Sequence, residues 1–523
     1  MNFIIPVVIV LWFFRMAKNV LFWVYLWQLK EYHIGRFTDH FRTYRGSHLF
    51  INSLIAVKIV LIRFLFVFSQ ANILVFILYG LEAGKVFFDV LRRSITRPVF
   101  TLKTLILSVA TIVIALVIVG ILFFVVGLSG NMFLVSLVVL DLASPLLVSV
   151  VVLLFQPIAV YQRNSMIQQA RKKRAEMSSL LVIGVTGSYG KSSVKELLFH
   201  IVSAKYKTLK TQKNNNSEVG ISQTILRGLR EEHEVFVCEM GAYNKGGIRL
   251  LASIAKPKIA IVTGINEQHM ATFGSQKNII EGKYELVESL DNKGVSIFNG
   301  FNPYCKEMYE RTQGKKRKIG KGGELWAENL IITKHEISFT AVHKEGESAA
   351  VQVRVGGPFL ENILLAQLAS LEVGIGLKES AHALSSFTGG LKVKKGINGA
   401  DIIDSSYSMN PTGAVSDIDY MNLWQGKKVV VMPSLIELGS SSKEVHKRIG
   451  EKIGQMSDYA IITTKDRFKE ISEEAVAQGM KKDNIVLEEQ PAVILKIIQD
   501  MVKEGDVVLL EGRVPQGLLK LLA

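Results

Sequence analysis

The stretch LLVIGVTGSYGKSSVKELL, residues 180–198, decides the fold of the C-terminal part of this chain. It begins as an apolar, strand-like run and then turns through glycines. It continues as a helix whose apolar residues recur at helical spacing, at Val194, Leu197, Leu198, Ile201 and Val202. A glycine-rich turn between a strand and a helix lets backbone N–H groups approach phosphate at the helix N-terminus. We therefore predict a nucleotide phosphate site here.

The spacing of this loop differs from the general GxxxxGK[ST] pattern. That pattern needs a glycine where Val185 stands, and Gly184 lies one residue too early. In the remaining T-G-x-x-G-K-S, Lys191 is placed to reach the β and γ phosphates and the Ser192 hydroxyl to ligate Mg²⁺. The alternative is an ordinary glycine-rich turn, but the strand before it and the helix after it favour phosphate binding. The predicted nucleotide-binding residues of the loop are Thr186, Gly187, Ser188, Gly190, Lys191, Ser192 and Ser193.

The composition indicates a membrane part joined to a soluble part. Of the 523 residues 49% are hydrophobic, and the excess is concentrated before residue 157. The formal net charge is +16, but many basic residues flank apolar segments, as in RNSMIQQARKKR at 163–174. This pattern is typical of cytoplasmic loops beside anionic lipid and argues against nucleic-acid binding. The two cysteines, Cys238 and Cys305, offer neither a disulfide framework nor a cysteine-type zinc site, and they suit a reducing cytoplasm.

Four apolar runs precede residue 157 and cover 3–28, 50–90, 102–127 and 131–156. Because a helical span needs about 20 apolar residues, we expect about four to five transmembrane helices within residues 1–160. The 50–90 run is long enough for two passes that turn near Ser69–Asn72, and the last two runs are each predicted to be a clean span. The loops rich in Lys and Arg lie at 30–48, 92–103 and 161–175. If all three are cytoplasmic, the chain is a multi-pass protein of the cytoplasmic membrane with its C-terminal part inside the cell.

From residue 179 onward, short apolar strands alternate with amphipathic helices. This alternation predicts a parallel α/β sheet whose site lies at the carboxyl ends of the strands. Residues 323–355 alternate instead like an antiparallel excursion. A second alternating unit follows, so we expect an α/β nucleotide-binding central domain at 179–395 and a Rossmann-like α/β domain at 396–523.

Three further side chains fall at or near the same predicted sheet edge. Glu239 ends the strand VFVCEM, His269 follows the strand KIAIVTGI, and Lys283 lies on the next helix. Each has a plain alternative: a solvated glutamate, a capping histidine and a surface lysine. The oxygen ligands of Glu239 suit Mg²⁺, whereas histidine is a less usual partner for that ion.

Several motifs together resemble one family. VTGSYGKSS, NNNSEVGISQTIL, VFVCEMGAYNKGGI, QHMATFGS and EGKYELVESL follow one another in the order and spacing of the Mur ligases. IIDSSYSMNPTGA at 402–414 and ELGSSSKEVHKRIG at 437–450 resemble the same family. The resemblance covers about 179–523 and is closest to the branch that adds D-alanyl-D-alanine to UDP-N-acetylmuramoyl-tripeptide. The loop of this family is TGxxGK[ST], which accounts for the unusual glycine spacing.

The resemblance implies roles for the matching positions. The implied catalytic residues are Lys191, Lys283 and His269. The implied metal ligands are Ser192, Glu239, His269 and Lys283, the last being a lysine that is carbamylated in many members. The implied nucleotide-facing residues beyond the loop are Asn362, Asp404 and Tyr407. The residues that fall in the substrate-side loop are Asn216, Ser217 and Glu218.

The implied activity is that of an ATP- and Mg²⁺-dependent ligase in peptidoglycan precursor synthesis. The γ-phosphoryl group of ATP passes to a carboxylate, and the amine of an amino acid or dipeptide attacks the acyl phosphate to give an amide, ADP and phosphate. Catalysis then depends on neutralising phosphate charge and on holding the reactants in line. The expected partners are ATP, a nucleotide- or lipid-linked carboxylate precursor, the amine and the membrane, without nucleic acid.

This sequence also departs from the pattern of the family. The usual His-Asn before the adenine asparagine is replaced by Pro358-Phe359, and an acid and an amide are lost at Ser405 and Ser408. The motif before Glu-Leu-Gly reads PSL at 433–435, and Lys392 or Lys395 stands in for the linker arginine. The N-terminal domain that binds the UDP-sugar in the family is replaced by the apolar runs, which leaves the linkage of the substrate open.

Three other interpretations remain open at this point. One is an amino-acid ligase of the folylpolyglutamate or cyanophycin-synthetase kind that acts on a substrate outside the wall. Another is an ATP-driven transporter, although the apolar runs contain few acidic residues, among them Asp89 and Asp141. The third is a degenerate ligase that serves as a membrane scaffold.

Overall fold

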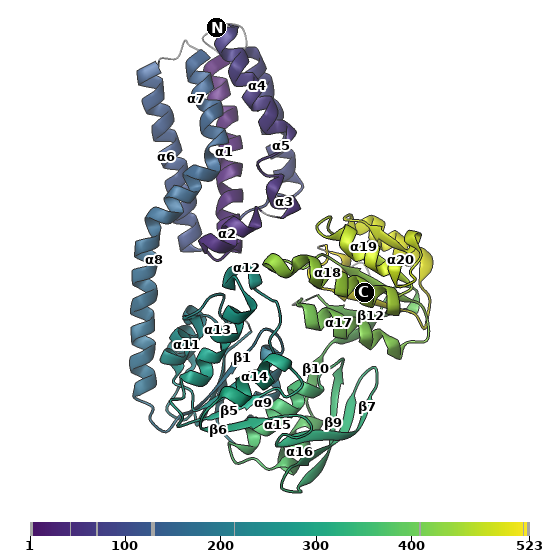
Figure 1. Ribbon diagram of the computed structural model, residues 1–523. Coiled ribbons are helices and arrows are strands. Elements are labelled where there is room, and N and C mark those ends of the chain that lie inside the picture. Colours follow the sequence, from purple (N-terminus) through teal and green to yellow (C-terminus); the bar gives the residue numbers. More distant parts are fainter. Residues whose placement is uncertain are drawn as a thin grey trace. The chain divides into compact units, whose positions relative to one another are not determined.

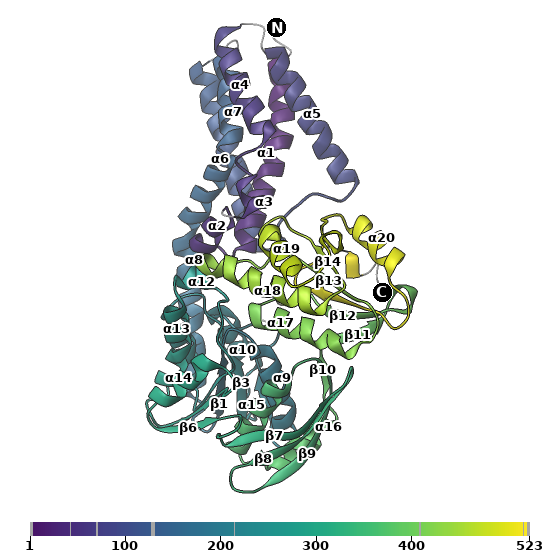
Figure 2. The same ribbon diagram turned by 45° about the vertical axis from the view of Figure 1, so that its right-hand side comes forward.

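The computed structural model describes residues 4–41, 43–68, 72–126, 131–213, 215–406, 409–515 and 517–519, without the side chains of residues 45 and 126. Two compact units make up the chain (Figures 1 and 2), Met1–Arg163 and Asn164–Ala523, here called unit 1 and unit 2. Unit 1 is helical, and unit 2 contains the β-sheets. The expected multi-domain architecture, with apolar helices followed by α/β domains, is confirmed.

Unit 1 consists of packed helices. They are α1 (Ile4–Leu29), α2 (Ile34–His40), α3 (Tyr44–Ser47), α4 (Ser53–Val67), α5 (Asn72–Leu91), α6 (Leu102–Val126), α7 (Asn131–Leu142) and α8 (Ser144–Ala175), the last continuing into unit 2. Among the described residues, three helices are long and apolar enough to cross a membrane, namely α1, α6 and α8. Helices α4 and α7 have only 15 and 12 residues, and α5 carries Glu82, Lys85 and Asp89, so these three fall short of the expected spans.

Residues 131–156, expected to form one clean span, do not form one continuous helix. Helix α7 ends at Leu142 and α8 begins at Ser144. Pro145 explains the break, because proline has no N–H to donate to the carbonyl of the preceding helical turn. The 50–90 run does form two helices, α4 and α5, while residues 69–71 of the expected turn lie outside the described residues.

Two of the Lys- and Arg-rich loops meet at one end of unit 1. The Gln28 side-chain amide donates to the Val99 carbonyl at 3.0 Å and accepts from the Val99 N–H at 2.7 Å. The Gln156 amide of α8 donates to the Tyr32 carbonyl at 3.3 Å. Residues at the starts of loops 30–48 and 92–103 therefore lie at the same end of unit 1 as Gln156 of α8.

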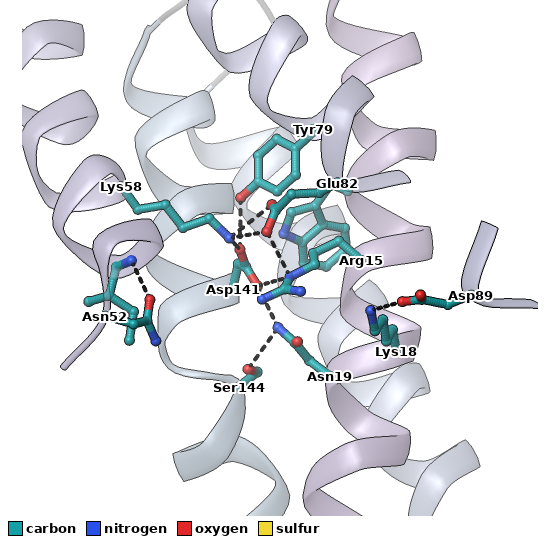
Figure 3. Close-up of polar contacts among 12 residues, drawn as sticks. Arg15, Lys18, Asn19, Asn52, Lys58, Tyr79, Glu82, Asp89, Asp141 and Ser144 are labelled. Atoms are coloured by element: carbon teal, nitrogen blue, oxygen red, sulfur yellow. Dashed lines mark hydrogen bonds and ion pairs between the residues drawn. The ribbon is translucent and has the colours of Figure 1, made fainter. Parts of the chain in front are cut away.

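A buried ion-pair network joins four helices of unit 1 (Figure 3). The Lys58 ammonium of α4 contacts the Asp141 carboxylate of α7 and lies 2.9 Å from a carboxylate oxygen of Glu82 on α5. Nε of Arg15, near the middle of α1, lies 3.1 Å from Glu82. Lys58, Glu82 and Asp141 are each less than a tenth exposed. The network balances two positive against two negative charges.

Neutral groups complete the coordination of Asp141. The Tyr79 hydroxyl donates to one of its carboxylate oxygens at 3.3 Å, and the Asn19 amide donates to the other at 2.7 Å. Removing one partner from a buried charge pair is strongly destabilising, because the other charge is left unpaired in an apolar surrounding. Each of the four helices therefore depends on the others for a partner to its buried charge.

Unit 2 begins with the last turns of α8, which pack against the first sheet. The Arg174 guanidinium donates to the carbonyls of Ala255, Met177 and Leu180 at 2.9, 2.7 and 3.1 Å. Ile167 and Ala170 are buried in the same apolar cluster as the strands. Arg174 thus joins the carbonyl at the end of a neighbouring helix to two carbonyls of the segment that follows α8.

The first sheet is parallel, with the order β2-β3-β1-β4-β5-β6. Its strands are β1 (Leu181–Thr186), β2 (Thr208–Lys210), β3 (Val235–Glu239), β4 (Ile259–Val262), β5 (Val295–Phe298) and β6 (Lys315–Lys318). Its helices are α9 (Lys191–Ser203), α10 (Glu218–Gly228), α11 (Gly247–Ala255), α12 (Met270–Phe273), α13 (Gln276–Glu288) and α14 (Pro303–Arg311). Because β1 lies between β3 and β4, the loop after β1 emerges in the middle of the carboxyl edge.

The antiparallel excursion expected at 323–355 is present. Strands β7 (Leu325–Ile332), β8 (Ile337–His343) and β9 (Ser348–Gly356) pair antiparallel, and β10 (Thr388–Gly390) joins β9 in parallel. The apolar face of this sheet shares a core with α9 and with two helices of its own, α15 (Leu360–Leu371) and α16 (Leu377–Ser385).

The C-terminal sheet has the order β11-β12-β16-β13-β14-β15 and is parallel except for β11. Its strands are β11 (Lys392–Lys395), β12 (Asp401–Ser405), β13 (Lys428–Met432), β14 (Tyr459–Ile462), β15 (Ile485–Leu487) and β16 (Val507–Glu511). Its helices are α17 (Pro411–Tyr420), α18 (Ser442–Met456), α19 (Phe468–Ala477) and α20 (Pro491–Met501), with short 3₁₀ turns η1 (Ile397–Gly399), η2 (Met421–Leu423), η3 (Gly439–Ser441) and η4 (Lys482–Asn484). Lys395 of β11 pairs with Asp401 at 3.0 Å.

Candidate nucleotide and metal site

The loop between β1 and α9 has the backbone of a phosphate cradle. Gly187 and Gly190 have positive φ angles of 150° and 77°, and α9 begins at Lys191. A Cβ at Gly187 would stand 2.2 Å from the Thr263 hydroxyl, and a Cβ at Gly190 would stand 2.5 Å from the Asn362 amide oxygen. Both positions therefore require glycine. The second contact places Asn362, at the start of α15, beside the loop as expected for a nucleotide-facing residue.

Lys191 folds back over the loop. Its ammonium donates to the carbonyls of Gly187 at 2.8 Å and Ser188 at 3.2 Å. Burial lowers the pKa of Lys191, while the nearby Glu239 carboxylate acts in the opposite direction. The ammonium is thus held at the centre of the cradle by carbonyls that a phosphate oxygen could replace.

Glu239 joins several predicted residues at the end of β3. Val185 of β1 pairs with Glu239 in the sheet register, which brings the glutamate next to the loop. Its carboxylate accepts from the Ser192 hydroxyl at 2.9 Å and from the Asn216 amide at 2.9 Å. It also lies 3.1 Å from the Lys195 ammonium, and Glu239 is only 2% exposed. The predicted Ser192, Glu239 and Asn216 therefore form one cluster.

Lys195 is a site residue that the motif analysis did not single out. It is 1% exposed, and its ammonium also donates to the Lys213 carbonyl at 2.9 Å. The signal in the sequence is its spacing. Lys195 follows Lys191 by one helical turn and so shares its face of α9, next to the apolar Val194 and Leu198.

The Ser192–Glu239 pair offers oxygen donors of the kind that Mg²⁺ prefers. A hydroxyl and a carboxylate 2.9 Å apart, beside a phosphate cradle, suit an ion that takes only one or two protein ligands and completes its shell with phosphate and water. Among the described residues, no group of three His, Cys, Asp or Glu side chains is arranged to hold a metal by itself. The donor set therefore fits a Mg²⁺ ion that binds together with a nucleotide.

His269 lies in the loop that follows β4. Its Nδ1 lies 2.8 Å from a carboxylate oxygen of Glu437, and its ring meets the edge of Tyr243 with centroids 4.7 Å apart. Burial lowers the pKa of His269, Glu437 opposes that shift, and the ammonium groups of Lys283 and Lys191 add to it. The imidazole is therefore largely neutral at neutral pH, the form that ligates metals.

Lys283 is buried on α13, with 2% of its surface exposed. Its ammonium donates to the Ala242 carbonyl at 3.1 Å and lies 5.5 Å from the centre of the Phe273 ring. Burial, together with the positive charge of Lys191, holds the pKa of Lys283 well below the ordinary value for lysine. The plain alternative of a surface lysine is wrong, because the side chain lies inside the domain.

The remaining loop residues have structural contacts. The Thr186 hydroxyl donates to the Met240 carbonyl at 3.0 Å, and the Ser188 N–H donates to the Gly264 carbonyl at 2.7 Å. Ser193 lies in the first turn of α9. Ser217 caps α10 by accepting from the Gly220 N–H at 3.3 Å, and Glu218 is the first residue of that helix.

The C-terminal domain contacts the central domain through the segment after β12. The buried Asn266 amide donates to Asn410 at 2.8 Å and to Thr412 at 3.0 Å. Asp404 accepts from the N–H and the hydroxyl of Ser406 at 3.1 and 2.6 Å, which holds the start of this loop. The predicted Tyr407, like Ser408, lies outside the described residues.

Ser405, where the family pattern has an acid, contacts acids of its own domain. Its hydroxyl donates to the Asp417 carboxylate at 2.5 Å, and Glu511 pairs with Ser405 in the sheet register. Burial raises the pKa of Asp417 to about 6. An aspartate at position 405 would add a third carboxylate to this buried pair, so the serine is the residue that these surroundings accommodate.

Comparison with family models matches residues 185–370 to the Mur ligase middle domain and residues 391–514 to the Mur ligase glutamate ligase domain. The chain belongs to the Mur ligase family. The resemblance seen in the motifs is thereby confirmed, and both matched segments lie in unit 2.

Relatives of this Mur ligase include the UDP-N-acetylmuramoyl-tripeptide–D-alanyl-D-alanine ligases of Bacillus subtilis and Mycobacterium leprae. The first is 29% identical over 66% of this chain and 76% of the relative, and the second is 26% identical over 65% and 72%. Among solved structures, MurF from Thermotoga maritima in complex with ADP has a TM-score of 0.59 and 25% identity, covering 69% of this chain and 83% of that one. MurF from Acinetobacter baumannii has a TM-score of 0.62 at 24% identity, over 69% and 79%. The chain is a MurF-like, ATP-dependent Mur ligase of the amide-forming type.

Proposed function

We propose that this Mur ligase uses ATP and Mg²⁺ to join the carboxylate of a peptidoglycan precursor peptide to D-alanyl-D-alanine or a closely related amine. We further propose that it is anchored in the cytoplasmic membrane by residues 1–160, with its catalytic domains at 179–395 and 396–523 in the cytoplasm. The observation that carries the proposal is the cluster of Ser192, Asn216 and Glu239 beside the Lys191 loop.

The residues of the loop account for the first half of the reaction. Backbone N–H groups around Gly187 and Gly190 receive the phosphates at the start of α9, and Lys191 neutralises the charge on the transferred group. Ser192 and Glu239 hold Mg²⁺, which supplies further neutralisation of the phosphate oxygens when bound. Lys195 keeps the Glu239 carboxylate aimed at the loop, while Asn362, Asp404 and Tyr407 are proposed to face the nucleotide.

The second half of the reaction needs the carboxylate substrate near the γ-phosphate. Asn216 contacts Glu239 and belongs to the segment that also contains Ser217 and Glu218, so this segment is proposed to receive the carboxylate precursor. Phosphoryl transfer to the carboxylate releases ADP, and attack of the amine on the acyl phosphate releases phosphate and forms the amide. Holding the carboxylate and the γ-phosphate in line is a further contribution to the rate.

An anchored enzyme suits a precursor that is also held at the membrane. Confinement of enzyme and substrate to one surface raises their effective concentration without any new contact. We therefore include a lipid-linked precursor, alongside the UDP-linked one, as a proposed substrate.

The test is a product analysis with the purified full-length chain in detergent or vesicles. ATP, Mg²⁺ and D-alanyl-D-alanine are supplied with either the UDP-linked tripeptide or a lipid-linked tripeptide precursor, and products are identified by mass spectrometry. We expect ADP, phosphate and an amide product in equal amounts, dependent on both substrates. ATP hydrolysis without an amide, or no turnover with any carboxylate, would contradict the proposal.

Lys283 gives a second prediction for the same reaction. A lowered pKa keeps part of its amine neutral, which is the form that reacts with CO₂ to give a carbamate. We expect Lys283→Ala to lower the rate of amide formation by about 10²-fold, as for loss of one charge-stabilising group. Acetate or formate should restore part of that rate by supplying the missing carboxylate, whereas the wild type should not respond.

Lys277 on the same helix provides the control, because it is exposed. Lys277→Ala should keep the wild-type rate and should not respond to acetate. A Lys283→Ala variant that is fully active would remove the proposed role of this lysine.

A further inference from the structure

Two residues that are not glycine yet have left-handed backbone meet within unit 2. His269 has a φ angle of 65° and Glu437 one of 63°. Such a conformation is strained for a residue with a side chain and persists only where the surroundings hold it. The two side chains meet with His269 Nδ1 2.8 Å from Glu437 Oε2.

Backbone contacts hold the same junction. The Ala271 N–H donates to the Glu437 carbonyl at 3.0 Å. A Cβ added at Gly439, whose φ is also positive, would stand 3.1 Å from the Ala271 nitrogen. The Glu437–Gly439 segment of the C-terminal domain therefore packs directly on the residues that follow His269.

The hydrogen bond to Glu437 decides which imidazole nitrogen of His269 is available to a metal. When Nδ1–H donates to the Glu437 carboxylate, Nε2 carries the lone pair and is the nitrogen that can ligate a metal. Such a carboxylate also raises the basicity of the ligating nitrogen and fixes the ring orientation. The Tyr243 ring, edge-on at 4.7 Å, restricts the imidazole from the side.

We propose that Glu437, which belongs to the C-terminal domain, is a positioning residue for the metal site of the central domain. By accepting from Nδ1 of His269, it presents Nε2 to the site beside the phosphate loop. Metal affinity then depends on the docking of the C-terminal domain. This inference rests on the proposed function, since it assigns a residue to the same site.

An ion pair between the same two domains provides a matched control. Arg448 of α18 pairs with Glu267 at 3.2 Å, only two residues from His269 in the sequence, and the arginine side chain is 45% exposed. Its loss removes a contact between the domains but leaves His269 untouched. Arg448→Ala therefore separates the orientation of His269 from general weakening of the domain contact.

The experiment measures Mn²⁺ binding to the full-length, ADP-bound protein by electron paramagnetic resonance, so that no turnover is needed. We expect Glu437→Ala to weaken Mn²⁺ binding by about 10- to 100-fold, the range for loss of a group that orients a metal ligand. Glu437→Gln keeps an acceptor for Nδ1–H and should lose less, while Arg448→Ala should stay within about twofold of the wild type. Thermal unfolding of each variant checks that it is folded.

Equal Mn²⁺ affinity in Glu437→Ala and Arg448→Ala would overturn the inference, as would wild-type affinity in Glu437→Ala. In turnover assays, the Mg²⁺ concentration for half-maximal rate should rise in Glu437→Ala with a smaller change in kcat. If no variant, the wild type included, forms an amide while the Mn²⁺ affinities still differ as expected, the proposed function fails and the role of Glu437 stands.

Discussion

Replacing Lys191 by alanine should lower the rate of ATP-dependent amide formation by about 10³-fold or more. Removal of one preorganised group that stabilises developing charge costs about 10²–10³ in rate, and Lys191 contributes a full positive charge at the centre of the phosphate cradle. Its ammonium is held there by the Gly187 and Ser188 carbonyls at 2.8 and 3.2 Å. Single-turnover formation of ADP by the purified full-length chain measures the effect.

Lys207→Ala is the matched control for this substitution. Lys207 is an exposed lysine of the same domain that pairs with Glu232 at 3.3 Å on the surface. It should retain the wild-type rate, because exposed ion pairs contribute little. If Lys191→Ala forms the amide at the wild-type rate while it remains folded, the assignment of the loop as the phosphate site is wrong.

Replacing Lys58 by methionine should destabilise unit 1 by about 3–5 kcal/mol, the cost of removing one partner from a buried charge pair. Methionine keeps the unbranched shape of the lysine side chain without its charge, and it leaves Glu82 and Asp141 with Arg15 alone, so that one negative charge is uncompensated. Thermal unfolding of the full-length chain in detergent, followed through the helical signal, measures the change.

The charge-balanced double variant, Lys58→Met with Asp141→Asn, should recover part of the lost stability because it removes the surplus charge together with its partner. Lys85→Met, at an exposed position of α5, should stay within about 0.5 kcal/mol of the wild type. A Lys58→Met protein as stable as the wild type would show that the network does not hold the helices together.

Much of the fold follows from local patterns in the sequence. The strand, glycine turn and helix of 181–203 depend on residues adjacent in the chain, and glycine is needed where φ is positive. The alternation of strands and helices likewise predicted the parallel sheets, and the periodicity of 323–355 predicted the antiparallel strands. The helix break at 143 was missed, although Pro145 marks it, because the run was judged by its hydropathy.

The apolar helices of unit 1 show the limit of hydropathy more clearly. In the sequence alone, Arg15 and Lys58 only interrupt apolar runs, and Asp141 is one of the few acidic residues in those runs. Their mutual distances show instead that they neutralise one another inside the bundle. Which acid meets which base depends on how four helices pack, and no local pattern contains that information.

The sequence by itself was enough to recognise the family and to predict the phosphate loop with the candidate residues Lys191, Ser192 and Glu239, because these belong to short motifs whose chemistry follows from adjacent residues. The tertiary structure alone decided which partners these residues have. Lys195 reaches Glu239 across 44 positions of the chain, and His269 reaches Glu437 across 168. Such pairs form only when the sheet register and the contact between the domains bring distant segments together, since burial makes each charge depend on the partner that the fold supplies.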